Sequence, residues 1–290
     1  MVSHPVPAPI VLLGGGKLAE AIIKGLLRSG NVRASDLRVT VRRPERGEEL
    51  RSRHGVQVLT DNAQAVRGAA VVLLSVRQAQ MAELMACIFP ALEAGQVVVS
   101  LSADVRLAQL EAALPAGVSI LRAIPPTPVG VGAGVTPITA GSRMTESARR
   151  VTDALFAALG RPLWVSEEEL TVCTGVSGTG PAYVFRFVEA LAQAAMAHGM
   201  GAAEAAALAE GTLIGAAKLL AEPGATTSGL IAQVATPGGI TVAGLEALEA
   251  HGLSRAVGEA VTVAIQRAKE RADASARSAQ SGAEAHSAPK

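Results

Sequence analysis

The stretch that decides the fold lies near the N-terminus, where residues 10–30 read IVLLGGGKLAEAIIKGLLRSG. Its first four residues, Ile10–Leu13, form an apolar run with the length and composition of a buried strand. Three consecutive glycines follow, and apolar residues then recur at helical spacing until Gly30 ends the pattern. The stretch therefore predicts a strand, a tight turn and a helix.

Strand-like and helix-like segments continue to alternate through the first half of the chain. Further apolar runs lie at residues 37–41, 56–59, 70–76, 96–101 and 119–123, with helix-length segments between most of them. This alternation is typical of the α/β class and predicts a doubly wound parallel sheet. Two more strands, at 134–138 and 162–165 around a helix at 145–159, are expected to complete a domain of residues 1–166.

Strand signals end at Glu167, and the rest of the chain is expected to be helical. The predicted helices are residues 183–198, 203–221, 227–234, 242–250 and 254–271. Aromatic residues make up only 2% of the chain, so small residues are expected to let these helices approach closely, within one chain or between two. An interleaved dimer fits this composition. Residues 272–290 lack apolar periodicity and are predicted to be a disordered tail.

Composition argues against several functional classes. A formal net charge of +1 makes nucleic acid and membrane surfaces unlikely partners. No apolar run approaches the ~20 residues of a spanning helix, and the first nine residues do not resemble a secretory signal. We expect a cytoplasmic protein. Cys87 and Cys173 are predicted to be buried free thiols, and the histidines show no ligand spacing, so no metal site is expected.

The pattern Gly14-x-Gly16-x-x-Ala19, between a strand and a helix, is the fingerprint of a dinucleotide-binding turn. The end of the next strand indicates which cofactor binds. An NAD site usually has Asp or Glu there, whereas this chain has Arg42 and Arg43, whose guanidinium groups suit a 2′-phosphate. The sequence therefore favours NADPH, with NADH still possible. The alternative is that both arginines are simply solvated.

Two glycine-rich passages interrupt the helical half, GVSGTGPAY at residues 175–183 and TPGGITVAGL at 236–245. Gly and Pro destabilise helices unless they cap, turn or allow close approach to a ligand. Each passage leads into a helical pattern, so each is expected to present free N–H groups at a helix N-terminus, where a carboxylate can bind. The alternative is a pair of tight turns between packed helices.

On these motifs the chain resembles the pyrroline-5-carboxylate reductase family, over residues 10–270. The resemblance implies an N-terminal Rossmann-type dinucleotide-binding domain at residues 1–166 and an all-helical C-terminal substrate and dimerisation domain at 167–271. It implies a homodimer or a higher homo-oligomer such as a decamer. It also implies the last step of proline biosynthesis, in which NADPH transfers a hydride to the C=N carbon of 1-pyrroline-5-carboxylate and L-proline forms.

The resemblance assigns roles to individual residues. Thr241 matches the catalytic threonine, whose hydroxyl lies beside the ring nitrogen. No strong acid or base is required, because an imine is readily protonated and the enzyme mainly orients the reactants. The substrate-binding residues implied are Thr236, Gly238, Gly239, Ile240, Ser177 and Thr179. The cofactor-binding residues implied are Gly14, Gly16, Lys17, Leu18, Arg42, Arg43, Asn62, Ser75 and Arg77.

Three segments around the expected cofactor site depart from the family's common residues. Pro126 stands in place of an asparagine and removes both an amide side chain and a backbone donor. These departures leave two alternatives open, a reductase of another cyclic imino acid and a non-catalytic dinucleotide-binding paralogue. The departing segments are Lys17-Leu18 for Asn-Met, Arg77-Gln78 for Lys-Pro, and Ile124-Pro125-Pro126 for Met-Pro-Asn.

Overall fold

The computed structural model describes residues 6–287, with the backbone alone described at 275, 276 and 278–287. The chain divides into two compact units. The first unit runs to Thr179 and resumes at Ala264, and the second is Gly180–Val263. This division differs from the expected boundary after residue 166, because helix α7 (Glu167–Cys173) packs against a strand of the first unit.

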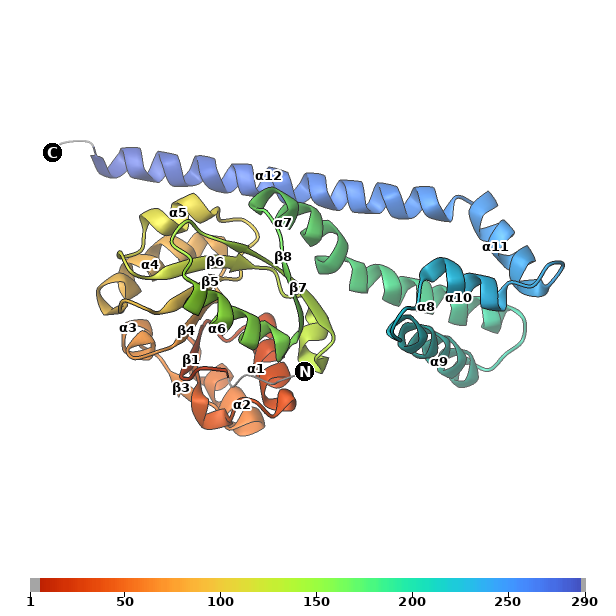
Figure 1. The fold of residues 1–290 in the computed structure, drawn as a ribbon, viewed down its shortest axis with the longest axis horizontal. Helices are drawn as coiled ribbons and strands as arrows, with labels where there is room; N and C mark the ends of the chain where they lie inside the picture. Colours follow the sequence, from red (N-terminus) through yellow and green to blue (C-terminus); the bar gives the residue numbers. More distant parts are fainter. Residues whose placement is uncertain (1–5, 288–290) are drawn as a thin grey trace. The chain divides into compact units, whose positions relative to one another are not determined.

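An eight-stranded sheet forms the centre of the first unit, in the order β3-β2-β1-β4-β5-β6-β7-β8 (Figure 1). Strands β1 to β6 are parallel, as predicted, whereas β7 runs antiparallel to β6 and parallel to β8. The reversal follows from the short turn Thr127–Val131, since a parallel connection needs a longer crossover. The strands are β1 (Ile10–Leu13), β2 (Leu37–Thr40), β3 (Gln57–Leu59), β4 (Val71–Leu74), β5 (Val97–Ser100), β6 (Ser119–Ala123), β7 (Gly134–Ala140) and β8 (Gly160–Trp164).

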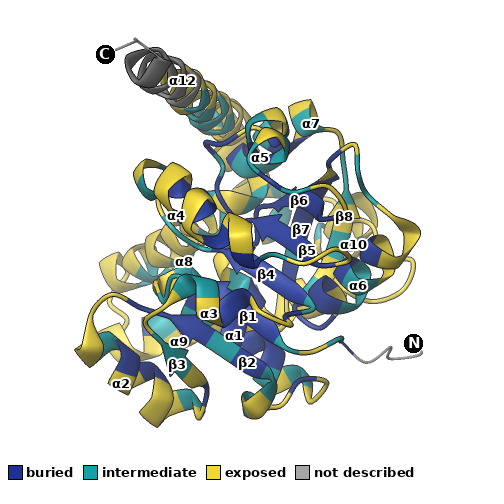
Figure 2. Ribbon diagram, turned by 90° about the vertical axis from the view of Figure 1, so that its left-hand side faces the viewer, coloured by how far each residue is buried: buried dark blue, intermediate teal, exposed yellow. Residues whose placement is uncertain are grey.

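Apolar side chains cover both faces of this sheet and form two core clusters. Successive residues of β1 alternate between them, because strand side chains point to opposite faces: Ile10 and Leu12 join one cluster, Val11 and Leu13 the other. Figure 2 shows the buried strands inside more exposed helices. The helices besides α7 are α1 (Lys17–Ser29), α2 (Pro44–His54), α3 (Asn62–Val66), α4 (Met81–Ile88), α5 (Leu107–Ala112) and α6 (Glu146–Ala157).

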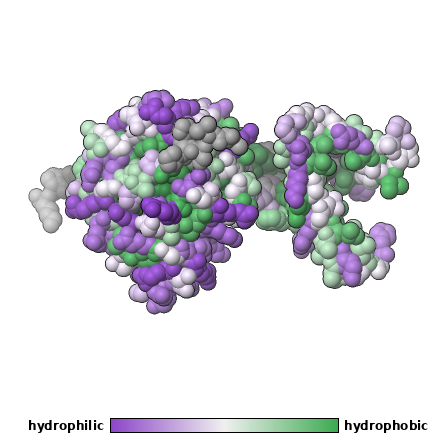
Figure 3. Space-filling view, turned by 60° about the horizontal axis from the view of Figure 1, so that its bottom comes forward, coloured by the Kyte–Doolittle hydropathy of each residue, from purple (hydrophilic) through white to green (hydrophobic). Residues whose placement is uncertain are grey.

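The second unit is helical and has very little core of its own. Of its residues, only Ala205 and Ala209 are buried. Large apolar side chains such as Phe185 remain exposed, and Figure 3 shows apolar surface on this unit. Extensive exposed apolar surface marks an interaction site. The unit comprises α8 (Gly180–Ala197), α9 (Ala202–Leu220), α10 (Thr227–Val234), α11 (Ile240–Ala250) and the first residues of α12 (Leu253–Ser287).

Two predictions about the C-terminal residues and the thiols are wrong. Helix α12 continues to Ser287 instead of becoming disordered at Ala272. Missing apolar periodicity argues against burial, but a segment rich in Ala, the strongest helix former, can still extend a helix that is already nucleated. Residues 288–290 lie outside the described part. Cys87 is exposed and Cys173 is partly exposed, so neither is a buried thiol.

Candidate functional site

The glycine-rich turn after β1 is held between the ends of two neighbouring strands. Gly14 has a φ of +102°, and a Cβ atom there would lie 2.5 Å from the carbonyl oxygen of Ser75. Its N–H group donates to the carbonyl oxygen and to Oγ1 of Thr40, each at 3.2 Å. Both the left-handed backbone and the close approach to Ser75 require glycine.

The N-terminus of α1 follows this turn directly. Gly16 is the N-cap residue, in an extended conformation, and no side chain caps the helix. A Cβ atom at Gly16 would meet nothing within 4 Å, and Lys17 beside it is exposed. An accessible helix N-terminus with uncapped N–H groups is an anion site. The turn therefore fits the pyrophosphate of a dinucleotide.

Arg46 of α2, which the sequence reasoning missed, braces this turn. Its Nε donates to the carbonyl oxygen of Gly15 at 2.9 Å, Nη2 to Glu20 at 2.5 Å and Nη1 to Glu49 at 2.9 Å. The hydrogen bond from Arg46, followed by that from His54, lowers the pKa of Glu20 from 4.5 to about 2. Gly15 and Glu20 are 31 and 26 residues away in sequence, so no local spacing could reveal the network.

The other predicted cofactor residues gather at the same edge of the sheet. Arg42 and Arg43 follow β2 and are exposed, and Arg43 is the N-cap residue of α2. Ser75 follows β4, and its N–H group donates to the carbonyl oxygen of Leu13 at 2.9 Å. The carboxyl ends of parallel strands meet at one edge, where α/β sheets bind ligands. Three further residues lie in this region: Asn62 at the start of α3, exposed Arg77 after β4, and half-buried Leu18 in α1.

Pro126 has a structural role that its sequence position did not reveal. It is buried, and its carbonyl oxygen accepts a hydrogen bond from the Val129 N–H group at 3.1 Å. This contact begins the short turn Thr127–Val131 that leads into β7. The departure from the family residue thus falls at the start of the turn that reverses the chain.

In the second unit, Thr236 to Thr241 form a turn that opens α11. Gly238 has a φ of +71°, and the Gly239 N–H group donates to the carbonyl oxygen of Thr236 at 2.9 Å. No side chain caps the helix, whose first residue, Ile240, is 94% exposed, while Thr241 is half-buried. The expected free helix N-terminus is therefore present at this passage.

The first glycine-rich passage has a different structure from the one expected. Residues Thr174–Gly178 form a π-helical segment that continues α7, and α8 begins at Gly180. The hydroxyl of Ser177 donates to the carbonyl oxygen of Cys173 at 2.9 Å, and that of Thr179 donates to Gly175 at 2.6 Å. Hydroxyls can bond back one helical turn in this way. Ser177 and Thr179 therefore lie within a helical run instead of at a free N-terminus. They belong to the first unit and Thr241 to the second.

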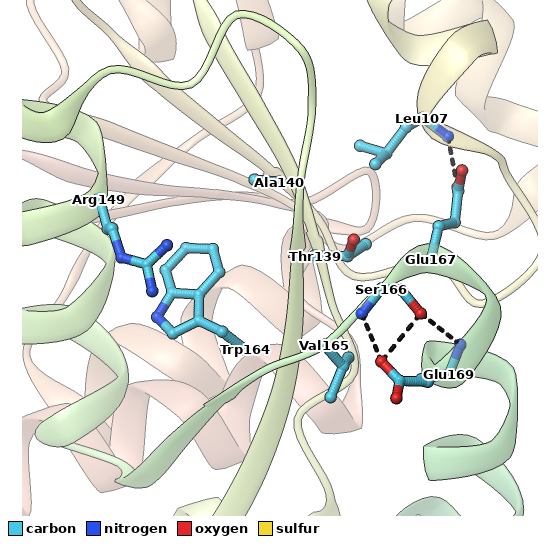
Figure 4. A pocket seen from close by; sticks show the side chains of 9 residues that line it. All are labelled: Leu107, Thr139, Ala140, Arg149, Trp164, Val165, Ser166, Glu167 and Glu169. Atoms are coloured by element: carbon cyan, nitrogen blue, oxygen red, sulfur yellow. Dashed lines mark hydrogen bonds between the residues drawn. The ribbon is translucent and has the colours of Figure 1, made fainter.

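A pocket of about 660 Å³ lies elsewhere in the first unit, and none of its lining residues is a predicted site residue (Figure 4). The Arg149 guanidinium stacks over the ring of Trp164, 4.2 Å from its centroid. The Ser166 N–H and hydroxyl groups both donate to Glu169, at 2.8 and 2.9 Å. These contacts stabilise the pocket walls. Its residues are Leu107, Thr139, Ala140, Arg149, Trp164, Val165, Ser166, Glu167 and Glu169.

Within the described residues, no cluster of His, Cys, Asp and Glu could hold a metal, and no helix could cross a membrane.

Comparisons with known proteins cover nearly the whole chain. Residues 167–271 match the family model for pyrroline-5-carboxylate reductase dimerisation, and residues 9–104 match the model described as NADP oxidoreductase coenzyme F420-dependent. The first match, together with the exposed apolar surface of the second unit, indicates a homo-oligomer.

Individual relatives agree with these matches. A pyrroline-5-carboxylate reductase of Corynebacterium melassecola is 37% identical over 90% of this chain and 97% of its own length. That of Escherichia coli K12 is 32% identical over 90% and 97%. The reductase structure from Coxiella burnetii has a TM-score of 0.84 at 32% identity and covers 91% of this chain and 98% of that one. The chain therefore belongs to the pyrroline-5-carboxylate reductase family.

Proposed function

We propose that this chain reduces 1-pyrroline-5-carboxylate to L-proline with NADPH, as the last step of proline biosynthesis. The observation that carries the proposal is similarity to reductases of this name over nine-tenths of the chain, at up to 37% identity. The uncapped N-terminus of α1 and that of α11 agree with it, because the cofactor and the substrate each carry an anionic group.

The first unit supplies the residues proposed to hold the cofactor. Gly14 allows the close approach to Ser75 that shapes the turn, Gly16 leaves open space for the pyrophosphate, and Lys17 adds a cation beside it. Arg42 and Arg43 bind the 2′-phosphate, which is the feature that separates NADPH from NADH. Bound NADPH supplies the hydride. The remaining residues proposed to line its site are Leu18, Asn62, Ser75 and Arg77.

The second unit supplies the residues proposed to orient the substrate. The N–H groups from Gly238 to Thr241, together with Thr236, hold the carboxylate at the start of α11. The Thr241 hydroxyl hydrogen-bonds the ring nitrogen and fixes the C=N bond for attack. Ser177, in the π-helical segment, and Thr179, which follows it, are also proposed to bind substrate. Their hydroxyls donate within the helix, yet each oxygen can still accept a hydrogen bond.

We further propose that two copies pair through the second unit, and that dimers assemble into a higher homo-oligomer such as a decamer. Only two of the unit's residues, Ala205 and Ala209, are buried in a single chain, so a partner chain completes its core. The functional division after residue 166 and a cytoplasmic location both remain predictions.

The decisive experiment measures NADPH oxidation with 1-pyrroline-5-carboxylate and with a panel of other cyclic imino acids. We expect the highest kcat/KM with 1-pyrroline-5-carboxylate and L-proline as the product. A higher value with a larger or smaller ring would favour the reductase of another imino acid. NADPH binding without turnover of any imine would favour the non-catalytic alternative.

A further inference from the structure

One contact at the cofactor edge is not explained by the proposed function. With the Gln80 amide oriented so that its oxygen faces Arg42, that oxygen accepts hydrogen bonds from Nη1 at 2.8 Å and Nη2 at 2.9 Å. The opposite orientation would direct the amide NH₂ toward the guanidinium N–H groups, which cannot accept a hydrogen bond. Both terminal nitrogens of Arg42 are therefore held by one neutral acceptor.

The two residues come from opposite sides of β1. Arg42 follows β2, and Gln80 ends the short 3-10 helix Gln78–Gln80 that follows β4. Because β1 pairs with β2 on one side and β4 on the other, the Arg42–Gln80 contact connects the loops on both sides of β1. The strand order reverses its direction between β1 and β4, and a dinucleotide binds at such a switch point. The contact thus spans the crevice that the cofactor enters.

We propose that Gln80 tunes the choice between NADPH and NADH by holding the Arg42 guanidinium. The inference rests on the proposed role of Arg42 as the 2′-phosphate ligand. A 2′-phosphate makes charge-assisted hydrogen bonds, which are stronger than those of a neutral amide, so it displaces Gln80 from Arg42. A cofactor with a 2′-hydroxyl carries no such charge and leaves the contact in place. Gln80 therefore weakens binding of the phosphorylated cofactor slightly and has little effect on the other.

This reasoning gives opposite expectations for two substitutions at the same position. Gln80→Ala frees Arg42 and should increase affinity for the 2′-phosphate by about 2- to 10-fold, the scale of one neutral hydrogen bond. Gln80→Glu replaces the amide with a carboxylate that pairs with Arg42 and competes with the phosphate. It should decrease that affinity by about 10-fold or more.

The test uses two probes that differ by the 2′-phosphate alone, adenosine 2′,5′-bisphosphate and 5′-AMP. Their dissociation constants are measured by calorimetry on the full chain, so that the result does not depend on turnover. Both Gln80 variants should bind 5′-AMP within about 2-fold of the parent. The matched control is Gln57→Glu, which makes the same change of charge at an exposed residue. Gln57 is the first residue of β3, so it lies at the amino ends of the parallel strands, away from the proposed cofactor site. It should bind both probes as the parent does.

Arg42→Ala separates the two proposals. If it leaves affinity for the bisphosphate unchanged, the proposed role of Arg42 is wrong, and the role of Gln80 is wrong with it. If Arg42→Ala lowers the affinity for the bisphosphate while neither Gln80 variant changes that affinity, only the proposed role of Gln80 is wrong. The double variant completes the cycle: Gln80→Glu should lose most of its effect in the Arg42→Ala background. If Gln80→Glu lowers the affinity just as much in the Arg42→Ala background, the glutamate repels the 2′-phosphate directly. That result would overturn the proposal that Gln80 acts through Arg42.

Discussion

Nε of Arg46 donates to the carbonyl oxygen of Gly15 at 2.9 Å, so a side chain of α2 braces the turn between β1 and α1. The same guanidinium binds Glu20 in the first turn of α1. The Arg46 side chain is only 16% exposed, and each of its nitrogens has a protein partner. Arg46 therefore shapes the turn that is proposed to bind the cofactor.

Replacement of Arg46 should weaken the binding of NADPH and of NADH equally. In Arg46→Met the turn loses its brace, and we expect the KM for NADPH and that for NADH to rise by about 10-fold, with kcat at saturation within about 2-fold. Steady-state kinetics with both cofactors provide the measurement. Arg53→Met removes an equal charge from a more exposed partner of Glu20 and should change neither KM. A loss confined to NADPH would instead mean that Arg46 contacts the 2′-phosphate.

The contacts of Glu20 with Arg46 and His54 should make the stability of the fold depend on pH below about 4.5. Because the folded-state pKa of Glu20 is lowered to about 2, the ionised carboxylate stabilises the fold above its ordinary pKa of 4.5, and this contribution is lost as the pH falls toward 2. Urea unfolding at fixed protein concentration should show Glu20→Gln to be less stable than the parent by about 1 to 2 kcal/mol at pH 7. The difference should shrink below pH 4.5. A difference that stays constant down to pH 2.5 would contradict this linkage.

Thr241 should affect the chemical step more than cofactor binding. Loss of one hydrogen bond to the ring nitrogen in Thr241→Ala should lower kcat by about 10-fold or more, and Thr241→Ser should restore much of it. The dissociation constant for NADPH should stay within about 2-fold. Thr212→Ala, which removes a hydroxyl bonded to Leu208 within α9, is the matched control. Full kcat in Thr241→Ala with every imine tested would leave Thr241 as an ordinary residue of the first helical turn.

The exposed apolar face of the second unit should be buried in the assembly. Phe185 is 65% exposed and lines an apolar groove of about 900 Å³ between α8 and α9. A carboxylate in a buried interface is costly, so Phe185→Asp should shift the protein toward monomer in light scattering at micromolar concentration. Phe89→Asp makes the same change at an exposed site of the first unit and should leave the assembly intact. A parent protein that is itself a fully active monomer would refute the proposed pairing.

The sequence could predict the elements whose determinants are local. The apolar run before Gly14 and the helical spacing after Gly16 predicted β1, the turn and α1, because strand and helix periodicities differ within a few residues. The direction of β7 was missed, although the short connection between the strands expected at 119–123 and 134–138 favours an antiparallel pair.

Residues that act through distant partners were also beyond the sequence. The roles of Arg46 and Gln80 depend on contacts with Gly15 and Arg42 that only the folded sheet brings together. The π-helical segment at Thr174 was missed for a different reason. Its glycines predicted a break between two helices. The chain instead stays helical through them, with a local change to π-helical hydrogen bonding.

The part of α12 that belongs to the first unit contacts the loop between β5 and α5 through two ion pairs of opposite polarity, Arg271 with Asp104 at 2.8 Å and Asp273 with Arg106 at 3.1 Å. A displacement of the helix that exchanged these partners would set arginine against arginine and aspartate against aspartate. The Arg106–Asp273 pair is exposed on both sides and adds little stability by itself, whereas Asp104 in the other pair is largely buried. Together the two pairs disfavour the alignment that exchanges the partners, because that alignment brings like charges together.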